Sequence, residues 1–346
     1  MLTAGMERAK GKGYPLSMLQ LFQNHLIIMK KITRFFIRFL GVAAVLLLAA
    51  AAWVQFSPLP TFETRSLELR IPSDSASLAH GRALAIGHCG HCHLGDDGRL
   101  SGRMFMRQQD AFGEIWSRNL TRHPEKGLGR YSDGELAWLM RTGVKRDGHM
   151  AGYFMSSLQV SDHDMACVIA FLRSNDPIVA PSEADPPHPQ YSFLAKALIK
   201  LGAFKPLPYD GAPVTEPPAS DPIAYGKYLA TGRYECYGCH SKSFETNDPV
   251  HPEKSEGYFA GGNPVLDANF NEVPSANITP SVLYGIGSWT EAQFSQALRG
   301  GLRPDQRALS PVMPRFANMS DEEVSAIWAY LQSVPVTDKQ VIMATR

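Results

Sequence analysis

The most apolar stretch of the chain runs from Phe39 to Phe56, FLGVAAVLLLAAAAWVQF, and contains no charged residue. Its length is close to the roughly 20 residues that a helix needs to cross the hydrocarbon core of a bilayer. Four basic side chains precede it closely: Lys30, Lys31, Arg34 and Arg38. Because such a cluster stays in the cytoplasm, the pattern predicts one transmembrane helix, with everything after residue 57 exported.

A cleaved signal peptide is the alternative for this segment, because Ala49 to Ala52 resemble the small residues of a cleavage site. We therefore divide the front of the chain into an extension of unknown role, residues 1–28, and a basic region with a membrane anchor or signal, residues 29–57. Met29 is a candidate start of the chain, since the Lys-Lys run after it is typical of an export signal.

Beyond the apolar segment, helical periodicity occurs in two copies of one arrangement. The last helix of each copy is expected to begin at Ser161 or Ser320, hydroxyl residues suited to cap a helix N-terminus. Its apolar positions then recur at helical spacing: Met165, Val168, Ile169 and Leu172 in the first copy, and Val324, Ile327, Trp328 and Leu331 in the second. No alternating strand pattern of any length competes, so we predict an all-α fold.

Other landmarks repeat in the same order. Cys89-Gly-His-Cys92-His93 superimposes on Cys236-Tyr-Gly-Cys239-His240 at an offset of 147 residues, and further landmarks follow at offsets of 158: Asn119 and Asn277, Arg141 and Arg299, Met155 and Met313. So many matches in one order indicate a duplicated domain.

Proline separates the two copies, since residues 177–222 contain 11 of the 25 prolines, which interrupt helices and central strands. Within this segment, Tyr191 to Phe204 has a brief helical pattern. The expected divisions are a linker (58–75), a first domain (76–176), a Pro-rich linker (177–220), a second domain (221–336) and a tail (337–346).

Charge excludes one class of partner. The chain has 34 basic and 33 acidic side chains, a net charge of +1, so it lacks the attraction that a nucleic-acid-binding surface needs. Five cysteines are too few for a disulfide scaffold, and four of them form the two pairs.

The paired cysteines carry the chemistry. In a Cys-x-x-Cys-His motif, two thiols add to the vinyl groups of one haem, and the adjacent imidazole binds its iron. We therefore expect two covalently bound haem c groups, on Cys89 and Cys92 and on Cys236 and Cys239, with His93 and His240 as axial ligands. A thiol redox pair, or one zinc ion shared by four thiolates, remains the alternative.

The opposite axial position of each iron needs a ligand, and Met155 and Met313 occupy the same position in the two copies. Met150 and His149 are rivals of Met155, and Met319 is a rival of Met313. Ligation by His and Met raises the potential of haem iron relative to two His ligands and closes both axial positions.

This series of motifs resembles class I cytochrome c. More closely, it is similar to the membrane-anchored cytochrome subunits of bacterial periplasmic alcohol and aldehyde dehydrogenases. The resemblance implies that the helices of Gly81 and Gly226 closely cross the last helix of each copy. It also implies that four side chains lie near the haem propionates: Asn119, Tyr131, Asn277 and Trp289.

The resulting hypothesis is two tandem class I cytochrome c domains behind one membrane helix, in the periplasm at the bacterial inner membrane. The donor is expected to be a periplasmic dehydrogenase or quinol, and the acceptor an oxidase or soluble cytochrome of a respiratory chain. Enzymatic activity is left open, and the alternative is a dihaem peroxidase or thiosulfate-oxidising enzyme with one open axial site.

We expect Cys167 to be a buried inert thiol, and His88 and His91 to tune local polarity only.

Overall fold

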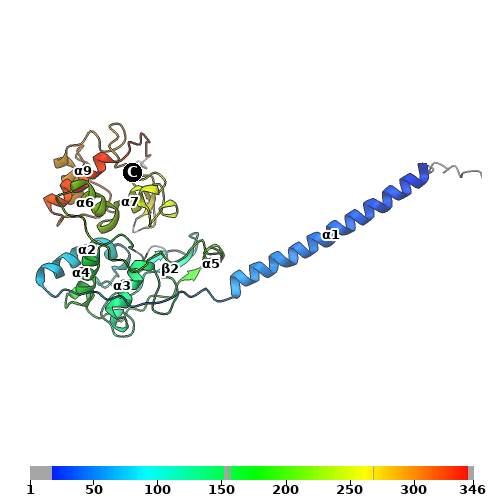
Figure 1. Ribbon diagram of the computed structural model, residues 1–346, viewed down its shortest axis with the longest axis horizontal. Helices are drawn as coiled ribbons and strands as arrows, with labels where there is room; N and C mark the ends of the chain where they lie inside the picture. Colours follow the sequence, from blue (N-terminus) through cyan, green and yellow to red (C-terminus); the bar gives the residue numbers. More distant parts are fainter. Residues whose placement is uncertain (1–17, 152–154, 156, 268, 342–346) are drawn as a thin grey trace, which may run out of the picture. The chain divides into compact units, whose positions relative to one another are not determined.

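The computed structural model describes residues 18–151, 155, 157–267 and 269–341, so part of the N-terminal extension and of the C-terminal tail lies outside the described residues. The chain divides into two compact units, one ending at Pro58 and one beginning at Leu59. The first unit contains a single long helix, α1 (Met18–Phe56) (Figure 1). Of the helices in the described residues, it alone is long and apolar enough to cross a membrane, judged by length and composition.

The second unit contains two hydrophobic cores, and we call the segments around them the first lobe (residues 59–214) and the second lobe (residues 219–341). The helices of the first lobe are α2 (Ser75–His93), α3 (Asp133–Thr142) and α4 (Asp162–Arg173), with 3₁₀ turns η1 (Leu128–Arg130) and η3 (Pro177–Val179). Helix α5 (Phe193–Lys200) follows, inside the segment that we expected to be a linker with a short helix.

The second lobe contains shorter helical pieces in a corresponding order. They are α6 (Pro222–Tyr228), the π-helical turn η4 (Leu229–Arg233), α7 (Cys236–His240), the 3₁₀ turns η5 (Phe244–Thr246) and η6 (Pro252–Lys254), α8 (Glu291–Ser295), the π-helical turn η7 (Gln296–Gly300) and α9 (Asp321–Ser333).

Side-chain caps begin the helices at the expected residues Ser161 and Ser320 and at two further residues. Ser132 and Thr290 each form a capping box with the residue three positions later, and so does Ser320 at α9. Ser161 caps α4 by accepting a hydrogen bond from the Asp164 amide. These bonds satisfy amides that the helix itself leaves without partners.

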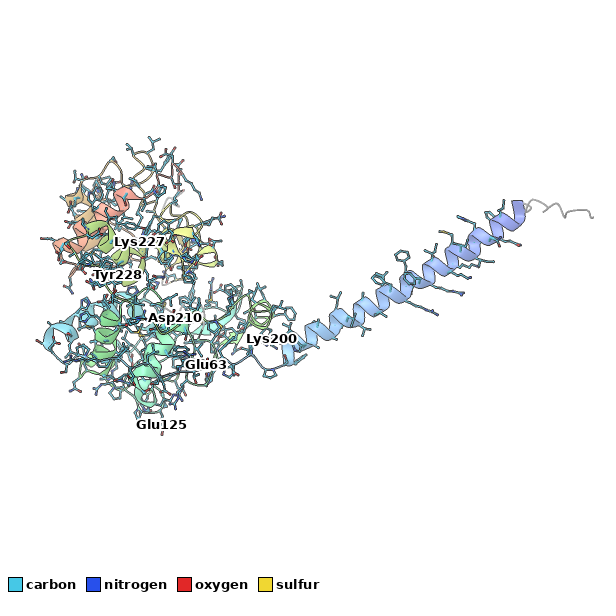
Figure 2. All side chains as sticks on the ribbon, viewed as in Figure 1. Glu63, Glu125, Lys200, Asp210, Lys227 and Tyr228 are labelled. Atoms are coloured by element: carbon cyan, nitrogen blue, oxygen red, sulfur yellow. The ribbon has the colours of Figure 1, made fainter. Side chains whose placement is uncertain are left out.

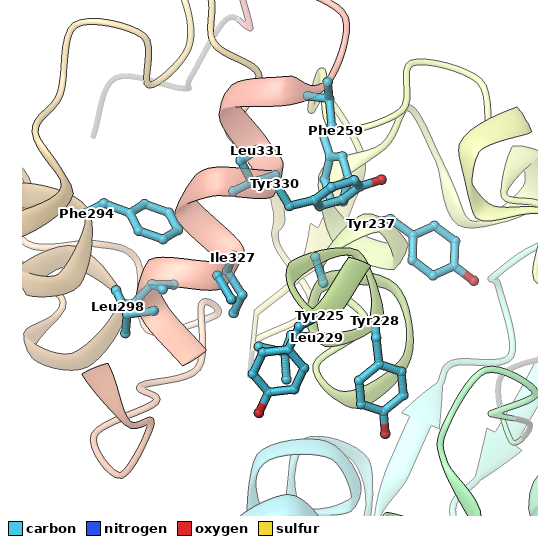
Figure 3. Packing of buried hydrophobic residues seen from close by; sticks show 14 of the residues in the cluster. Tyr225, Tyr228, Leu229, Tyr237, Phe259, Phe294, Leu298, Ile327, Tyr330 and Leu331 are labelled. Atoms are coloured by element: carbon cyan, nitrogen blue, oxygen red, sulfur yellow. The ribbon is translucent and has the colours of Figure 1, made fainter. Parts of the chain in front are cut away.

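Each lobe has its first helix packed across a later helix. Helix α2 crosses α4 at Gly81, and α6 crosses α9 at Gly226. In Figure 3, Ile327, Tyr330 and Leu331 of α9 lie beside the α6 segment that carries Tyr225. The crossing predicted from the resemblance is therefore present in both lobes.

The prediction of a purely helical fold is wrong in detail, because the lobes also contain small antiparallel sheets. In the first lobe, β2 (Gly113–Trp116) pairs with β1 (Met104–Met106) and with β3 (Gln190–Tyr191); in the second, β4 (Pro264–Leu266) pairs with β5 (Glu272–Pro274). These strands are too short to produce a detectable alternation of polar and apolar residues. Because β3 pairs with β2, the Pro-rich segment packs on the first lobe.

Candidate functional site

The first cysteine pair lies on the last turns of α2. Asp74 caps the start of this helix, and the helix ends at His93. Residues three positions apart face the same side of a helix, so the thiols of Cys89 and Cys92 share one face. None of the five cysteines of the chain, all among the described residues, forms a disulfide.

Burial keeps the paired thiols protonated. It raises the pKa of Cys89 to about 12 and that of Cys92 to about 11. In the second lobe, it raises the pKa of Cys236 to about 12 and that of Cys239 to about 11. A reactive thiol-redox centre needs a lowered thiol pKa, so these surroundings count against that alternative.

The histidine after each pair is oriented by one backbone hydrogen bond. The Nδ1 atom of His93 lies 2.6 Å from the Arg118 carbonyl, and Nδ1 of His240 lies 2.8 Å from the Ala276 carbonyl. Nδ1 therefore carries the proton, and the lone pair of Nε2 is free to bind a metal. Burial lowers the pKa of His93 to about 4 and also lowers that of His240, so both imidazoles are neutral, as metal ligation requires.

A thioether faces the first of these imidazoles. Met155 Sδ lies 3.5 Å from His93 Nε2, although 62 residues separate them in the chain. The structure therefore brings together the two expected axial donors of the first site. His149 lies instead beside Asp147, with its side chain 42% exposed, and Met150 forms a backbone bridge with Val144.

The methionine loop of each lobe accepts hydrogen bonds from an arginine side chain. The side chain of Arg141 is fully buried, and it donates to the carbonyl oxygens of Ser157, Leu158 and Val160, just after Met155. Its counterpart Arg299 donates to the carbonyl of Met319, six residues after Met313, at 2.8 Å. The sequence marked both arginines only as repeat landmarks, and a charged residue repeated beside the predicted ligand loop is the signal that could have identified their role.

The second cysteine pair opens into a cavity of about 670 Å³. Its lining includes Cys236, Cys239, His240, Met313 and Trp289, and most of the exposed lining is apolar. The volume lies in the range of small-molecule and cofactor sites. Met319, the rival of Met313, is 5% exposed and packs in the hydrophobic core. The donor set and the apolar cavity fit a covalently held haem.

Asn119 and Asn277 make the same structural contacts. The side-chain oxygen of each accepts hydrogen bonds from the amide and hydroxyl of the threonine two residues later. The side-chain nitrogen of Asn119 donates to the carbonyls of Ser182 and Ala184, in the segment after α4. The side-chain nitrogen of Asn277 donates to the carbonyls of Thr337 and Lys339, in the segment after α9. Both asparagines therefore fasten that segment to the lobe, and their place beside haem propionates stays a prediction.

The remaining predicted residues are distributed around the lobes. Tyr131 packs against the first core, and the guanidinium of Arg146 lies 5.7 Å from its ring centre. Cys167 is fully buried in α4, as expected, with its sulfur 3.7 Å from Nε2 of His163.

Among the described residues, no three His, Cys, Asp or Glu side chains are grouped in a way that could hold a metal ion. The shared four-thiolate zinc site is therefore not formed.

Two histidines have a more specific place than the sequence indicated. Gly87, His88 and His91 belong to α2 of the first lobe, yet they line the cavity of the second lobe. The sequence around these residues does not indicate that they line this cavity, because their position depends on how the two lobes dock.

The chain is similar to several known proteins. Residues 78–176 match the cytochrome c family, whose members carry covalently bound haem. The chain is 29% identical over 271 residues to the fructose dehydrogenase cytochrome subunit of Gluconobacter japonicus, which covers 75% of this chain and 53% of that protein. It is 30% identical over 283 residues to the cytochrome c subunit of alcohol dehydrogenase (quinone) from Gluconacetobacter polyoxogenes, covering 76% of this chain and 57% of that protein.

A shorter relative covers more of its own length. The chain is 27% identical over 268 residues to a diheme cytochrome c-type protein of Cereibacter sphaeroides, covering 74% of this chain and 85% of that protein. The chain thus spans about half the length of the two dehydrogenase subunits and most of the length of the dihaem protein.

Proposed function

We propose, on the premise that residues 78–176 form a cytochrome c domain, that the chain is a dihaem electron-transfer subunit. In this proposal, Cys89 and Cys92 hold one haem c, and Cys236 and Cys239 hold the other. A bound haem supplies an iron that alternates between its ferrous and ferric states. The chain's own residues bind each haem, fix the orientation of its axial ligands and exclude water.

The observation that carries the proposal is the approach of His93 Nε2 to Met155 Sδ at 3.5 Å, with Nδ1 of the same imidazole bonded to a carbonyl. A nitrogen and a sulfur donor at one iron leave no open axial position for a substrate. In the second lobe, His240 and Met313 line one cavity, which supports the same pair of axial ligands there. Closed axial positions favour electron transfer over catalysis at the iron.

The tandem arrangement is part of the proposal. We assign residues 76–176 and 221–336 to two cytochrome c domains, joined by residues 177–220 and preceded by the segment 58–75. The repeated helix crossing at Gly81 and Gly226 and the two equivalent histidine bonds support this division. The roles of residues 1–28 and 337–346 stay undefined.

The proposed location is the periplasmic side of the bacterial inner membrane, with α1 as a single-pass anchor. The exposed apolar surface of α1 and the four basic residues that precede Phe39 within this helix support this location. The donor is a periplasmic dehydrogenase or quinol, in keeping with the relatives named as dehydrogenase subunits. The acceptor is an oxidase or soluble cytochrome, and contact with such partners is expected to be small and transient.

A count of covalent haems tests the proposal. Intact-mass measurement of protein made with the haem-attachment machinery should give two haems per chain, and a Cys236→Ala, Cys239→Ala double variant should retain one. Cys167→Ala is the matched control and should retain two. Parent protein with one haem or none would contradict the dihaem assignment. High-spin ferric spectra or peroxide turnover would instead favour the dihaem enzyme.

A further inference from the structure

The residues that directly precede the two cysteine motifs lie close to each other in the structure. His88 directly precedes Cys89, and Glu235 directly precedes Cys236, so the repeat aligns His88 with Glu235. In the structure, Nδ1 of His88 lies 3.9 Å from a carboxylate oxygen of Glu235. The other ring nitrogen of His88 is hydrogen-bonded to the carbonyl of Arg233.

This contact joins residues at the same position of the two repeats, so the segments just before the first cysteine of each motif face each other. We call the contact between His88 and Glu235 the junction.

The junction also forms part of a wall of the second site. Gly87, His88 and His91 line the cavity that contains Cys236, Cys239 and His240. Tyr234, two residues before Cys236, packs against the cores of both lobes. The second site is thus completed by the helix that carries the first motif.

A buried ionic cluster holds the lobes in this arrangement. Arg233 of the second lobe is 5% exposed and donates to Asp164 of the first lobe at 2.7 Å and to Glu323 at 2.9 Å. The hydroxyl of Tyr228 also donates to Asp164 and accepts a bond from the Ser161 amide. Tyr228 is labelled in Figure 2, and Figure 3 shows its hydroxyl pointing away from the core of the second lobe. Separating the lobes would break these charge-assisted hydrogen bonds, which are stronger than bonds between neutral groups.

The backbone at Glu235 has an unusual conformation. This residue has φ 46° and ψ 36°, the left-handed region that non-glycine residues avoid. Such strain persists where surrounding contacts determine the conformation, and it often marks functional sites. Here the Glu235 carboxylate faces His88.

From these contacts we propose that His88 and Glu235 are positioning residues that hold the two haem-attachment segments together, so that a single electron passes internally between the haems. One iron is oxidised as the other is reduced, and no proton moves and no bond forms or breaks. This inference rests on the proposed dihaem function. It assigns His88 a role in setting the separation of the haems, where the sequence indicated only a local effect on polarity.

The test uses the full chain with both haems attached. One haem is reduced by a light pulse, and the equilibration of the electron between the two centres is followed by absorbance. His88→Ala should slow this internal step on the order of tenfold while both haems keep their low-spin spectra. His251→Ala is the matched control, since His251 forms a similar contact with Glu253 at 3.9 Å on the surface. An internal rate in His88→Ala equal to that of the parent would overturn the inference.

Two further measurements keep the test decisive if His88→Ala loads haem poorly. Glu235→Gln preserves the size of the side chain and should also slow the internal step, whereas a parental rate in this variant would count against the inference. In the oxidised parent, electron paramagnetic resonance should detect magnetic coupling between the two ferric centres, and uncoupled centres would overturn the proposed proximity. A parent with only one haem would instead contradict the proposed function itself, so the two failures are distinguishable.

Discussion

Gly81 in α2 passes so close to Cys167 in α4 that a Cβ atom on the glycine would lie 1.9 Å from the cysteine carbonyl oxygen. The same separation, 1.9 Å, recurs between a Cβ on Gly226 and the carbonyl oxygen of Ala326. Real Cβ atoms do not approach a carbonyl this closely, so each crossing requires glycine. The contact sets the position of α2, and hence of the cysteine pair and histidine at its end.

Gly81→Ala should therefore destabilise the first lobe. The methyl group has a rigid backbone as its neighbour, so the helices must move apart, and overpacking of this kind costs about 1–3 kcal/mol. Chemical unfolding monitored by circular dichroism would measure the loss. Gly87→Ala is the control on the same helix, because a Cβ there has no atom within 4 Å. Equal stability of the two variants would contradict the close crossing.

Met313→Ala should change one haem centre. Loss of a thioether ligand lowers the reduction potential of that centre and removes the far-red absorption of sulfur-ligated ferric haem. Redox titration and ferric absorption spectra would measure both effects. Met319→Ala is the matched control, since Met319 packs in the core and its loss should reduce stability while the far-red band remains. A band that persists in Met313→Ala would assign the ligand to another residue.

Arg141→Ala should loosen the loop that follows Met155. The fully buried guanidinium donates to several loop carbonyls and pairs with Asp162, so its removal leaves those groups without a donor. We expect a loss of about 2–4 kcal/mol in unfolding free energy and a weaker far-red band from the first haem. Thermal unfolding and absorption spectra would measure these changes.

The matched control for this arginine is Arg82→Ala. Arg82 forms a salt bridge with Asp176 and its side chain is 53% exposed. An exposed pair of this kind contributes about 0–1 kcal/mol, so the unfolding free energy should change little. If Arg141→Ala lowered the unfolding free energy no more than Arg82→Ala does, another residue would hold the loop in place.

The buried cluster around Asp164 should make stability depend on acid. Burial raises the pKa of Asp164, but hydrogen bonds from His80 and Arg233 outweigh it and hold the pKa well below its usual value. Because the folded-state pKa is depressed, this stabilisation is fully present above the unfolded-state pKa of about 3.9 and is lost as the pH falls below it.

Asp164→Asn should therefore flatten the acid limb of the stability profile, and it should lower stability at neutral pH by removing a charge that Arg233 requires. Urea midpoints measured between neutral pH and about pH 3 would reveal both changes. Asp185→Asn, at a side chain that is 61% exposed, is the control and should follow the parent. A parental acid limb in Asp164→Asn would show that the cluster does not govern acid stability.

Much of the local structure was predictable. The capping residues Ser161 and Ser320 begin helices where the sequence placed them, because caps act on neighbouring amides. The sequence also placed Met155 as the partner of His93, and the structure brings the two donor atoms together. Repetition supplied this prediction, since the same residue types recur in one order.

Contacts that follow from neither the repeat nor the family resemblance were not predictable. The strands pair through backbone atoms over two to four residues, which leaves no periodic pattern to detect. The role of Arg141 depends on a loop that folds back over it, and the place of His88 depends on the docking of two lobes. Neither arrangement is encoded in the spacing of residues near those positions.

The left-handed conformation of Glu235 sets stability and function against each other. A non-glycine residue in this conformation costs about 1 kcal/mol or more, which glycine would recover. Selection for higher thermal stability would therefore favour Glu235→Gly, and such a variant would lose the carboxylate that faces His88. Directed evolution for heat tolerance in this chain should accordingly be paired with a screen for rapid electron flow.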